Sequence, residues 1–131
     1  MKVAFATSDN VHINSHFGWA KNIDVYDVSP EGYNFLSTVT FDGNLKEDGD
    51  EDKLVPKVEA VIDCTLVYVS AIGGGAAARL INKRVTPIKS RSEEDEITQV
   101  LEHLVKTLKG NPPPWLRKAI QQDKVTNFVE E

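Results

Sequence analysis

The sequence predicts an α/β fold, in which a mixed sheet of about five strands is flanked by helices. Two observations lead to this prediction. First, residues 22–28 and 33–41 are strand-like segments joined by a turn, and the first of them alternates apolar and polar side chains, which is typical of an antiparallel hairpin. Second, strand-like and helical segments alternate in the rest of the chain, which favours helices on the faces of the sheet. A length of 131 residues suits one such domain.

The first part of the chain contributes three of the expected strands. Residues 2–7 are apolar and precede a turn-forming cluster, so we expect a buried strand there. A loop at 8–20 follows and carries two of the three histidines. The hairpin comes next, and Ser-Pro-Glu-Gly at 29–32 supplies its turn.

The second part alternates helices with strands. The expected elements are a solvated acidic loop at 42–53, helices at 51–60 and 76–82, and strands at 65–69 and 84–89. The continuous apolar run at 65–69 is typical of a central strand that is covered on both faces. Pro56 fits the helix at 51–60 only if it lies in the first turn.

A long amphipathic helix is expected at 92–109, because Ser92 and the acidic residues after it form a helix start and Gly110 forms a stop. We therefore expect an α/β domain at 1–110 and a proline-rich C-terminal arm with a short helix at 111–131. Trp115 in this arm is a candidate anchor for a partner protein. A helix that folds back onto its own core is the alternative.

Composition excludes several classes of protein. Fifteen Lys and Arg against twenty Asp and Glu give a net charge of −5, which argues against a nucleic-acid partner. The longest apolar stretch, 65–72, is far short of the roughly 20 residues that a membrane span needs. The single cysteine, Cys64, allows no internal disulfide, and no secretory leader precedes the first strand. We expect a cytoplasmic protein.

Common enzyme motifs are missing. The glycine run at 73–75 lacks the features of a P-loop or a dinucleotide site, and no nucleophile elbow or zinc-protease motif occurs. A Cys–His hydrolase or transferase remains open, with Cys64 as nucleophile beside His16 or His12. The alternative is that Cys64 is a small buried hydrophobic residue.

Two features suggest a binding site. His16 lies in a loop after the first strand, where Phe17 and Trp19 could wall a pocket; a turn histidine between core aromatics is the alternative. The second feature is the glycine turn Gly73, Gly74 and Gly75, which opens an alanine-rich helix. Free N–H groups there could hold an anion, with added charge from Arg79, although close helix packing also favours such residues.

We expect the ends of the first and fourth strands to lie near each other. This arrangement would bring His16, the strand of Cys64 and the glycine turn to one rim of the sheet. Cys64 itself lies at the start of its strand.

Several motifs resemble the dinitrogenase iron–molybdenum cofactor biosynthesis family, over roughly residues 1–122. They are S-H-F-G at 15–18, D-C at 63–64 and A-I-G-G-G-A-A-A-R at 71–79, together with G-D-E-D-K-L at 49–54, P-I-K at 87–89 and P-W-L-R-K-A-I at 114–120. The third glycine of the turn falls at a position that varies in the family, and His12 matches none of the motifs.

The resemblance implies a ribonuclease-H-like fold and a carrier that is not an enzyme. The cargo would be an iron–sulfur precursor cluster of the nitrogenase cofactor, passed from the radical enzyme that makes it to the scaffold complex that matures it. His16 and Cys64 become candidate cluster ligands, and Gly73–Gly75 the pocket floor. We expect a monomer or a weak homodimer. A nuclease is disfavoured, because the carboxylates crowd into loops and a helix start.

Elementary chemistry agrees with a carrier. Resident iron–sulfur clusters are usually held by about four thiolates, and this chain offers one. One thiolate and one imidazole could grip a finished cluster, and so few bonds would allow its release. Helix N–H groups, with Arg79 or Lys83, could steady the anionic sulfides without covalent bonds.

Overall fold

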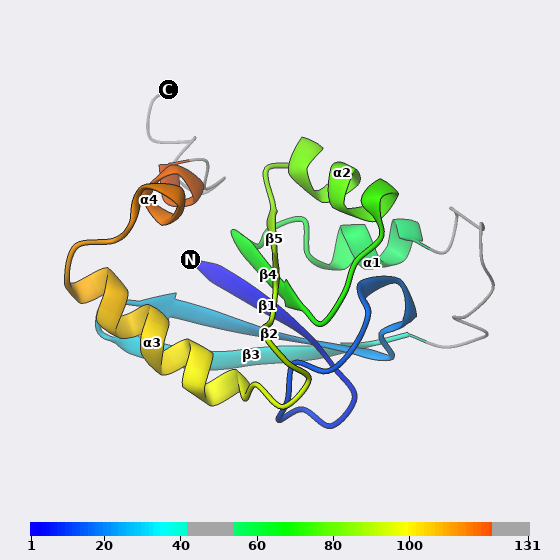
Figure 1. Ribbon diagram of the computed structural model, residues 1–131, viewed down its shortest axis with the longest axis horizontal. Coiled ribbons are helices and arrows are strands. Elements are labelled where there is room, and N and C mark those ends of the chain that lie inside the picture. The colour runs from blue at the N-terminus through cyan, green and yellow to red at the C-terminus, as the bar shows by residue number, and fades with distance from the viewer. Residues whose placement is uncertain (42–53, 122–131) are drawn as a thin grey trace.

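The computed structural model describes residues 1–41 and 54–121 (Figure 1). Within these ranges the strands are β1 (Lys2–Thr7), β2 (Asn22–Ser29), β3 (Gly32–Thr40), β4 (Leu66–Val69) and β5 (Thr86–Lys89). The helices are α1 (Leu54–Ala60), α2 (Gly74–Asn82), α3 (Ile97–Lys109) and α4 (Pro114–Gln121), and a 3₁₀ turn covers Phe17–Trp19. The expected α/β class is confirmed.

The sheet has the strand order β3-β2-β1-β4-β5. Strands β1, β4 and β5 are parallel, and β2 runs antiparallel to both of its neighbours. This mixed sheet is the arrangement that the family resemblance implied. The β2–β3 hairpin turns at Gly32, whose φ of 150° favours glycine. Its ladder is irregular: Tyr26 pairs with Phe35 and Val25 with Ser37, so Leu36 is an extra residue on the edge strand β3.

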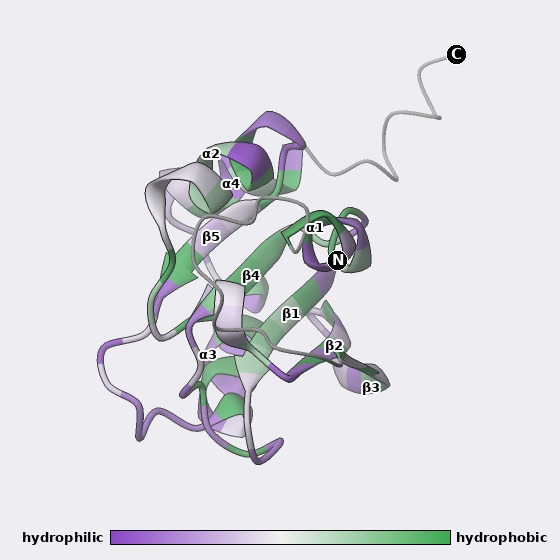
Figure 2. Cartoon of the chain, turned by 90° about the vertical axis from the view of Figure 1, so that its right-hand side faces the viewer, coloured by the Kyte–Doolittle hydropathy of each residue, from purple (hydrophilic) through white to green (hydrophobic). Residues whose placement is uncertain are grey.

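The sheet separates two hydrophobic cores. Alternate side chains of β1 enter opposite cores, Val3 and Phe5 on one face and Ala4 and Ala6 on the other. Helices α1 and α2 cover the alanine face, and α3 and α4 cover the Phe5 face. In the view of Figure 2, β1 and β4 are hydrophobic along most of their length, as central strands covered on both faces must be.

The starts of α2 and α3 differ from the sequence prediction, and α2 begins at Gly74, two residues before the expected 76. Helix α3 begins at Ile97 and not at Ser92. The intervening residues form a turn, in which the Asp95 carboxylate accepts the Arg91 backbone N–H and the Ser92 hydroxyl accepts that of Glu94. Such side-chain bonds compete with helix formation. Helix α1 is described over Leu54–Ala60 and contains Pro56; the loop expected at 42–53 and the first residues of the helix expected at 51–60 lie outside the described residues.

The C-terminal helix α4 packs onto the α3 side of the sheet. Leu116 is fully buried and Ala119 nearly so, in the same core as Phe5 and Leu101. Trp115 points elsewhere and is about half exposed. The division at residue 110 stays a prediction, and residues 122–131 lie outside the described part. Among the described helices, none combines the length and apolar character needed to cross a membrane.

Candidate functional site

His16 lies where the loop after β1 meets the end of β4. The Ser15 carbonyl accepts the Ser70 N–H at 3.0 Å, and the Ala71 carbonyl accepts the Phe17 N–H at 2.9 Å. His16 and Ala71 form an isolated parallel bridge between these two hydrogen bonds. The segment therefore lies alongside the chain that continues from β4, and His16 lies at the carboxyl end of the sheet.

The His16 ring is held on two sides. Its Nδ1 accepts the backbone N–H of Gly18 at 3.0 Å, and the ring stacks on Trp19 with centroids 4.6 Å apart. A Cβ at position 18 would lie 3.4 Å from the His16 ring, an ordinary van der Waals contact, so the ring packs directly over this residue. Because Nδ1 accepts a hydrogen bond, the neutral imidazole carries its proton on Nε2.

A buried lysine lies beneath this ring. Lys57 of α1 is 1% exposed, and its ammonium donates to the Gly18 carbonyl at 2.6 Å and lies 5.3 Å from the centre of the Phe41 ring. Burial, with a smaller contribution from the Lys57 charge, lowers the pKa of His16. His16 is therefore neutral at pH 7, and a neutral imidazole is the form that can coordinate a metal.

The glycine turn opens next to His16, because only Ile72 separates Ala71 from Gly73. Gly73 is the N-cap of α2 and supplies no side-chain cap, so the first N–H groups of the helix lack an intrahelical acceptor. A Cβ added at Gly73, Gly74 or Gly75 would meet no atom within 4 Å. Close packing thus does not explain these glycines, and the space beside the helix start is open.

The structure does not bring Cys64 to this rim. Cys64 precedes β4, whereas His16 pairs with Ala71 beyond the other end of that strand. Seven residues of extended chain separate the two ends by about 20 Å. Cys64 is also only 2% exposed and packs in the core with Val61 and Val85. In this fold a single cluster cannot touch His16 and Cys64 of one chain, and the ligand role of each stays a prediction.

Arg79 lies further along α2, about 7 Å from the helix start at 1.5 Å per residue. It borders a separate cavity of about 440 Å³ between α1 and α2, together with Lys83 and Glu59. The described residues contain no group of three or more His, Cys, Asp or Glu side chains that could hold a metal ion. A metal at the His16 rim would therefore have few protein ligands.

Sequence reasoning missed Lys57. The signal was available, because Lys57 adjoins the apolar positions Leu54, Val58 and Val61 of a helix that covers a core. A charged residue on such a face has to find a partner inside the protein. Trp19 was expected as a pocket wall and does stack on His16.

The fold defines a small α/β protein, and its described residues offer few potential metal ligands at the His16 rim. Comparison with known proteins agrees. Residues 1–107 match the family model described as "Dinitrogenase iron-molybdenum cofactor". The chain belongs to this family, which places it in the biosynthesis of the nitrogenase iron–molybdenum cofactor.

Relatives carry names from the same system. Protein NifX of Herbaspirillum seropedicae is 53% identical over 100% of this chain and 90% of its own length. Protein NifX of Sinorhizobium fredii is 42% identical, over 93% of this chain and 79% of its own length. The FeMo cofactor biosynthesis protein NifB of Bradyrhizobium diazoefficiens is 34% identical over 66% of this chain, which matches 17% of that protein.

A solved structure supports the fold. The crystal structure of PH0822 superposes with a TM-score of 0.56, covering 81% of this chain and 89% of that one. The sequence identity is 18%, so this likeness concerns the fold alone.

Proposed function

We propose that this protein is a non-enzymatic carrier of an iron–sulfur precursor of the iron–molybdenum cofactor. It would receive the cluster from the radical enzyme that makes it and deliver it to the maturation scaffold. The observation that carries the proposal is the pairing of His16 with Ala71, which sets a neutral imidazole beside an open glycine turn. Family membership supplies the cargo class.

The cluster would contact His16 in one of two ways. In the present tautomer, the Nε2–H can donate a hydrogen bond to a cluster sulfide. Coordination of iron through Nε2 requires the proton to move to Nδ1, which costs the hydrogen bond from Gly18. Metal-bound histidines usually donate their second N–H to an acceptor, and here Nδ1 faces a donor instead. In either case His16 makes a single contact with the cluster, and so few bonds suit a carrier.

The surroundings favour an anionic cargo. The positive end of the α2 dipole lies at the open glycine turn, and N–H groups at a helix start bind anions. The Lys57 charge beneath His16 adds to this potential, although its ammonium is committed to the Gly18 carbonyl. The half-exposed Trp19 gives the rim an apolar surface. These groups can hold a cluster without further iron–protein bonds.

Cys64 has a structural role in this proposal. Its sulfur lies in the core at the far end of β4, so contact with a cluster would require that end of the sheet to open. Arg79, inside α2, would act through its charge and not through contact.

The test is anaerobic loading with the precursor cluster, followed by desalting and measurement of iron and of visible absorbance. We expect His16→Ala to lose most of the bound iron, while His103→Ala, a change at an exposed histidine of α3, keeps it. Gly74→Val, which fills the open turn, should also reduce loading. Cys64→Ala should load normally. Equal loading of the His16 and His103 variants would refute the site.

Two further parts of the proposal concern partners. We propose that the exposed Trp115 on α4 contacts the enzyme or the scaffold, and that the carrier acts as a monomer or weak homodimer. Trp115→Ala should leave loading unchanged and slow the transfer of iron to an acceptor scaffold. An unchanged transfer rate would remove Trp115 from the docking surface.

A further inference from the structure

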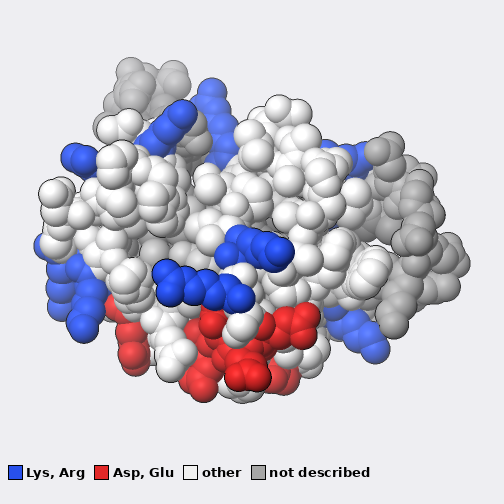
Figure 3. Space-filling view, in the orientation of Figure 1, with Lys and Arg blue, Asp and Glu red and all other residues white. Residues whose placement is uncertain are grey.

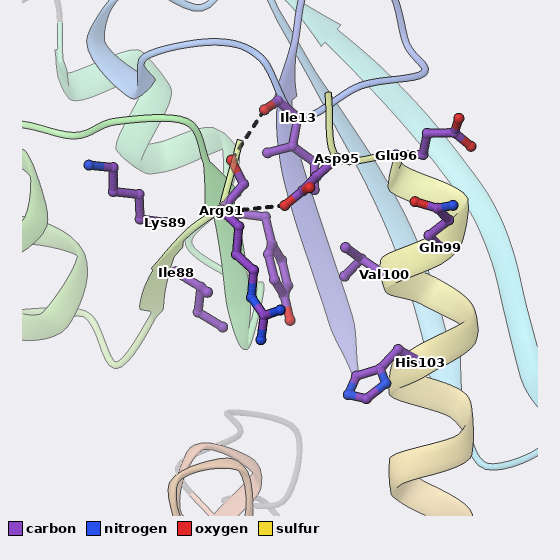
Figure 4. Close-up of a pocket in the computed structure, with 11 residues that line it drawn as sticks. Ile13, Ile88, Lys89, Arg91, Asp95, Glu96, Gln99, Val100 and His103 are labelled. Atoms are coloured by element: carbon purple, nitrogen blue, oxygen red, sulfur yellow. Dashed lines mark hydrogen bonds between the residues drawn. The ribbon is translucent and has the colours of Figure 1, made fainter. Parts of the chain in front are cut away.

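A cavity of about 330 Å³ opens between β5 and α3, and the residues around it are drawn in Figure 4. It lies on the α3 face of the sheet, whereas Phe17 beside the candidate cluster site packs in the opposite core. Its volume is within the range of small-molecule sites. Ile88 and Val100 form apolar walls on its two sides.

The floor holds a tyrosine hydroxyl that forms no hydrogen bond with a described residue and is open to the cavity. Tyr68 of β4 is 9% exposed, and no described residue forms a hydrogen bond with its hydroxyl. Its ring stacks on Phe5 with centroids 5.3 Å apart, which fixes its direction. Burial raises the pKa of Tyr68 to about 12, so the hydroxyl keeps its proton and can donate. Among the described residues every buried side-chain N or O atom has a partner, so this unpartnered hydroxyl is accessible from the cavity and can donate to a ligand there.

The Arg91 side chain, which is positively charged, borders the cavity. Figure 4 shows the Arg91 side chain running from the end of β5 toward the side where His103 lies, while Lys89 points away. No ion pair joins the Arg91 guanidinium to a described carboxylate, and Asp95 accepts the Arg91 backbone N–H at 2.9 Å. Guanidinium is permanently charged and suits the geometry of a carboxylate.

The acidic side chains around the cavity favour a singly charged anion over a multiply charged one. Figure 3 shows acidic side chains gathered beside two basic ones on this face, over the turn before α3. Asp95 and Glu96 of that turn border the cavity. Their negative charge disfavours phosphates and other multiply charged anions, which meet stronger repulsion than a single carboxylate does.

We propose that this cavity binds a small organic monocarboxylate with an apolar body. The carboxylate lies between the Arg91 guanidinium and the Tyr68 hydroxyl, and the body lies between Ile88 and Val100. This site is independent of the cluster site, because it uses the other face of the sheet.

Benzoate is a suitable probe, followed by ¹H–¹⁵N NMR titration of the full chain. A ligand of this size binds with a Kd of about 1 mM. We expect saturable shifts confined to the ends of β4 and β5 and the first turns of α3. Benzamide, which lacks the charge, and inorganic phosphate should both bind at least about fivefold more weakly.

Two variants test the assignment. Tyr68→Phe keeps the ring packing and should weaken benzoate about fivefold, and Arg91→Gln should weaken it about tenfold. Lys21→Gln, a matched loss of one exposed cation in the loop before β2, should change nothing. The proposal is overturned if 20 mM benzoate, about twenty times the expected Kd, gives no saturable shifts. It is also overturned if benzamide binds as well as benzoate, if phosphate binds more tightly, or if all three variants bind benzoate with equal affinity.

Discussion

Replacement of Leu116 by alanine tests whether the C-terminal helix belongs to the folded core. Leu116 is 0% exposed and lies in the core formed by β1, β4 and α3. If residues after 110 formed only an appended arm, the loss of one side chain there would leave the domain nearly as stable as before. The structure predicts a different result, because the leucine fills space beneath the sheet.

The size of the effect follows from burial. Truncation of a fully buried leucine to alanine costs about 3 kcal/mol of the free energy of unfolding, since the transfer of the methyl groups and the cavity both contribute. For a chain of this length, that loss lowers the melting temperature by about 10 °C. Trp115, the residue before Leu116, is 48% exposed, and Trp115→Ala should cost less than about 1 kcal/mol.

Urea unfolding followed by circular dichroism measures both variants, with the slope m as a check on two-state behaviour. Leu116→Ala should lower the midpoint with little change in m, and Trp115→Ala should stay near the parent protein. The reasoning would be refuted if Leu116→Ala lowered the free energy of unfolding by less than about 1 kcal/mol, or if both variants lowered it equally. Removal of most of a leucine side chain from a filled core should cost more than that.

Three more outcomes are expected. The Asp9 carboxylate accepts a hydrogen bond from the His12 ring, which raises the pKa of His12 and holds the pKa of Asp9 well below its usual range. The pair should therefore stabilise the fold fully between pH 3.8 and 6.5. Its contribution should fall as pH rises through the His12 pKa, and also as pH falls through the Asp9 pKa. The measurement compares the urea midpoints of the parent protein and of His12→Gln across pH, and a constant difference would contradict the prediction. Lys57→Met should raise the pKa of His16 in an NMR titration, because the substitution removes the Lys57 charge that helps to lower it. An unchanged or lower His16 pKa would contradict the position of Lys57 near the ring. Cys64 should react with a thiol reagent much more slowly in the folded protein than in urea, and equal rates would disprove its burial.

The strands could be predicted because their patterns are local. Alternation in residues 22–28 and continuous apolarity in β1 and β4 report directly how many faces of each strand are covered. The start of α3 could not be placed as well, because the Ser92 and Asp95 side chains satisfy the backbone of a turn with the same chemistry that begins helices.

Only part of the candidate site could be predicted from patterns in the sequence. The carboxyl ends of parallel strands meet at one edge, and this rule correctly joined His16 to the glycine turn. By the same rule, Cys64 at the amino end of β4 lies at the opposite edge. The hydrogen bond from Lys57 to the Gly18 carbonyl depends on how a helix packs over a loop, and no spacing in the sequence encodes that contact.

The extra residue at Leu36 also affects how copies of this chain meet. Strand β3 is the outer edge of the sheet, and its nine residues include no charge and no proline. Such an edge invites another strand to extend the sheet. The bulge opposite Val25 and Tyr26 shifts the spacing of the outward N–H and C=O groups halfway along, so that a straight strand could match only one half of the edge at a time. A single inserted residue thus protects the sheet against lateral growth where other proteins use a lysine.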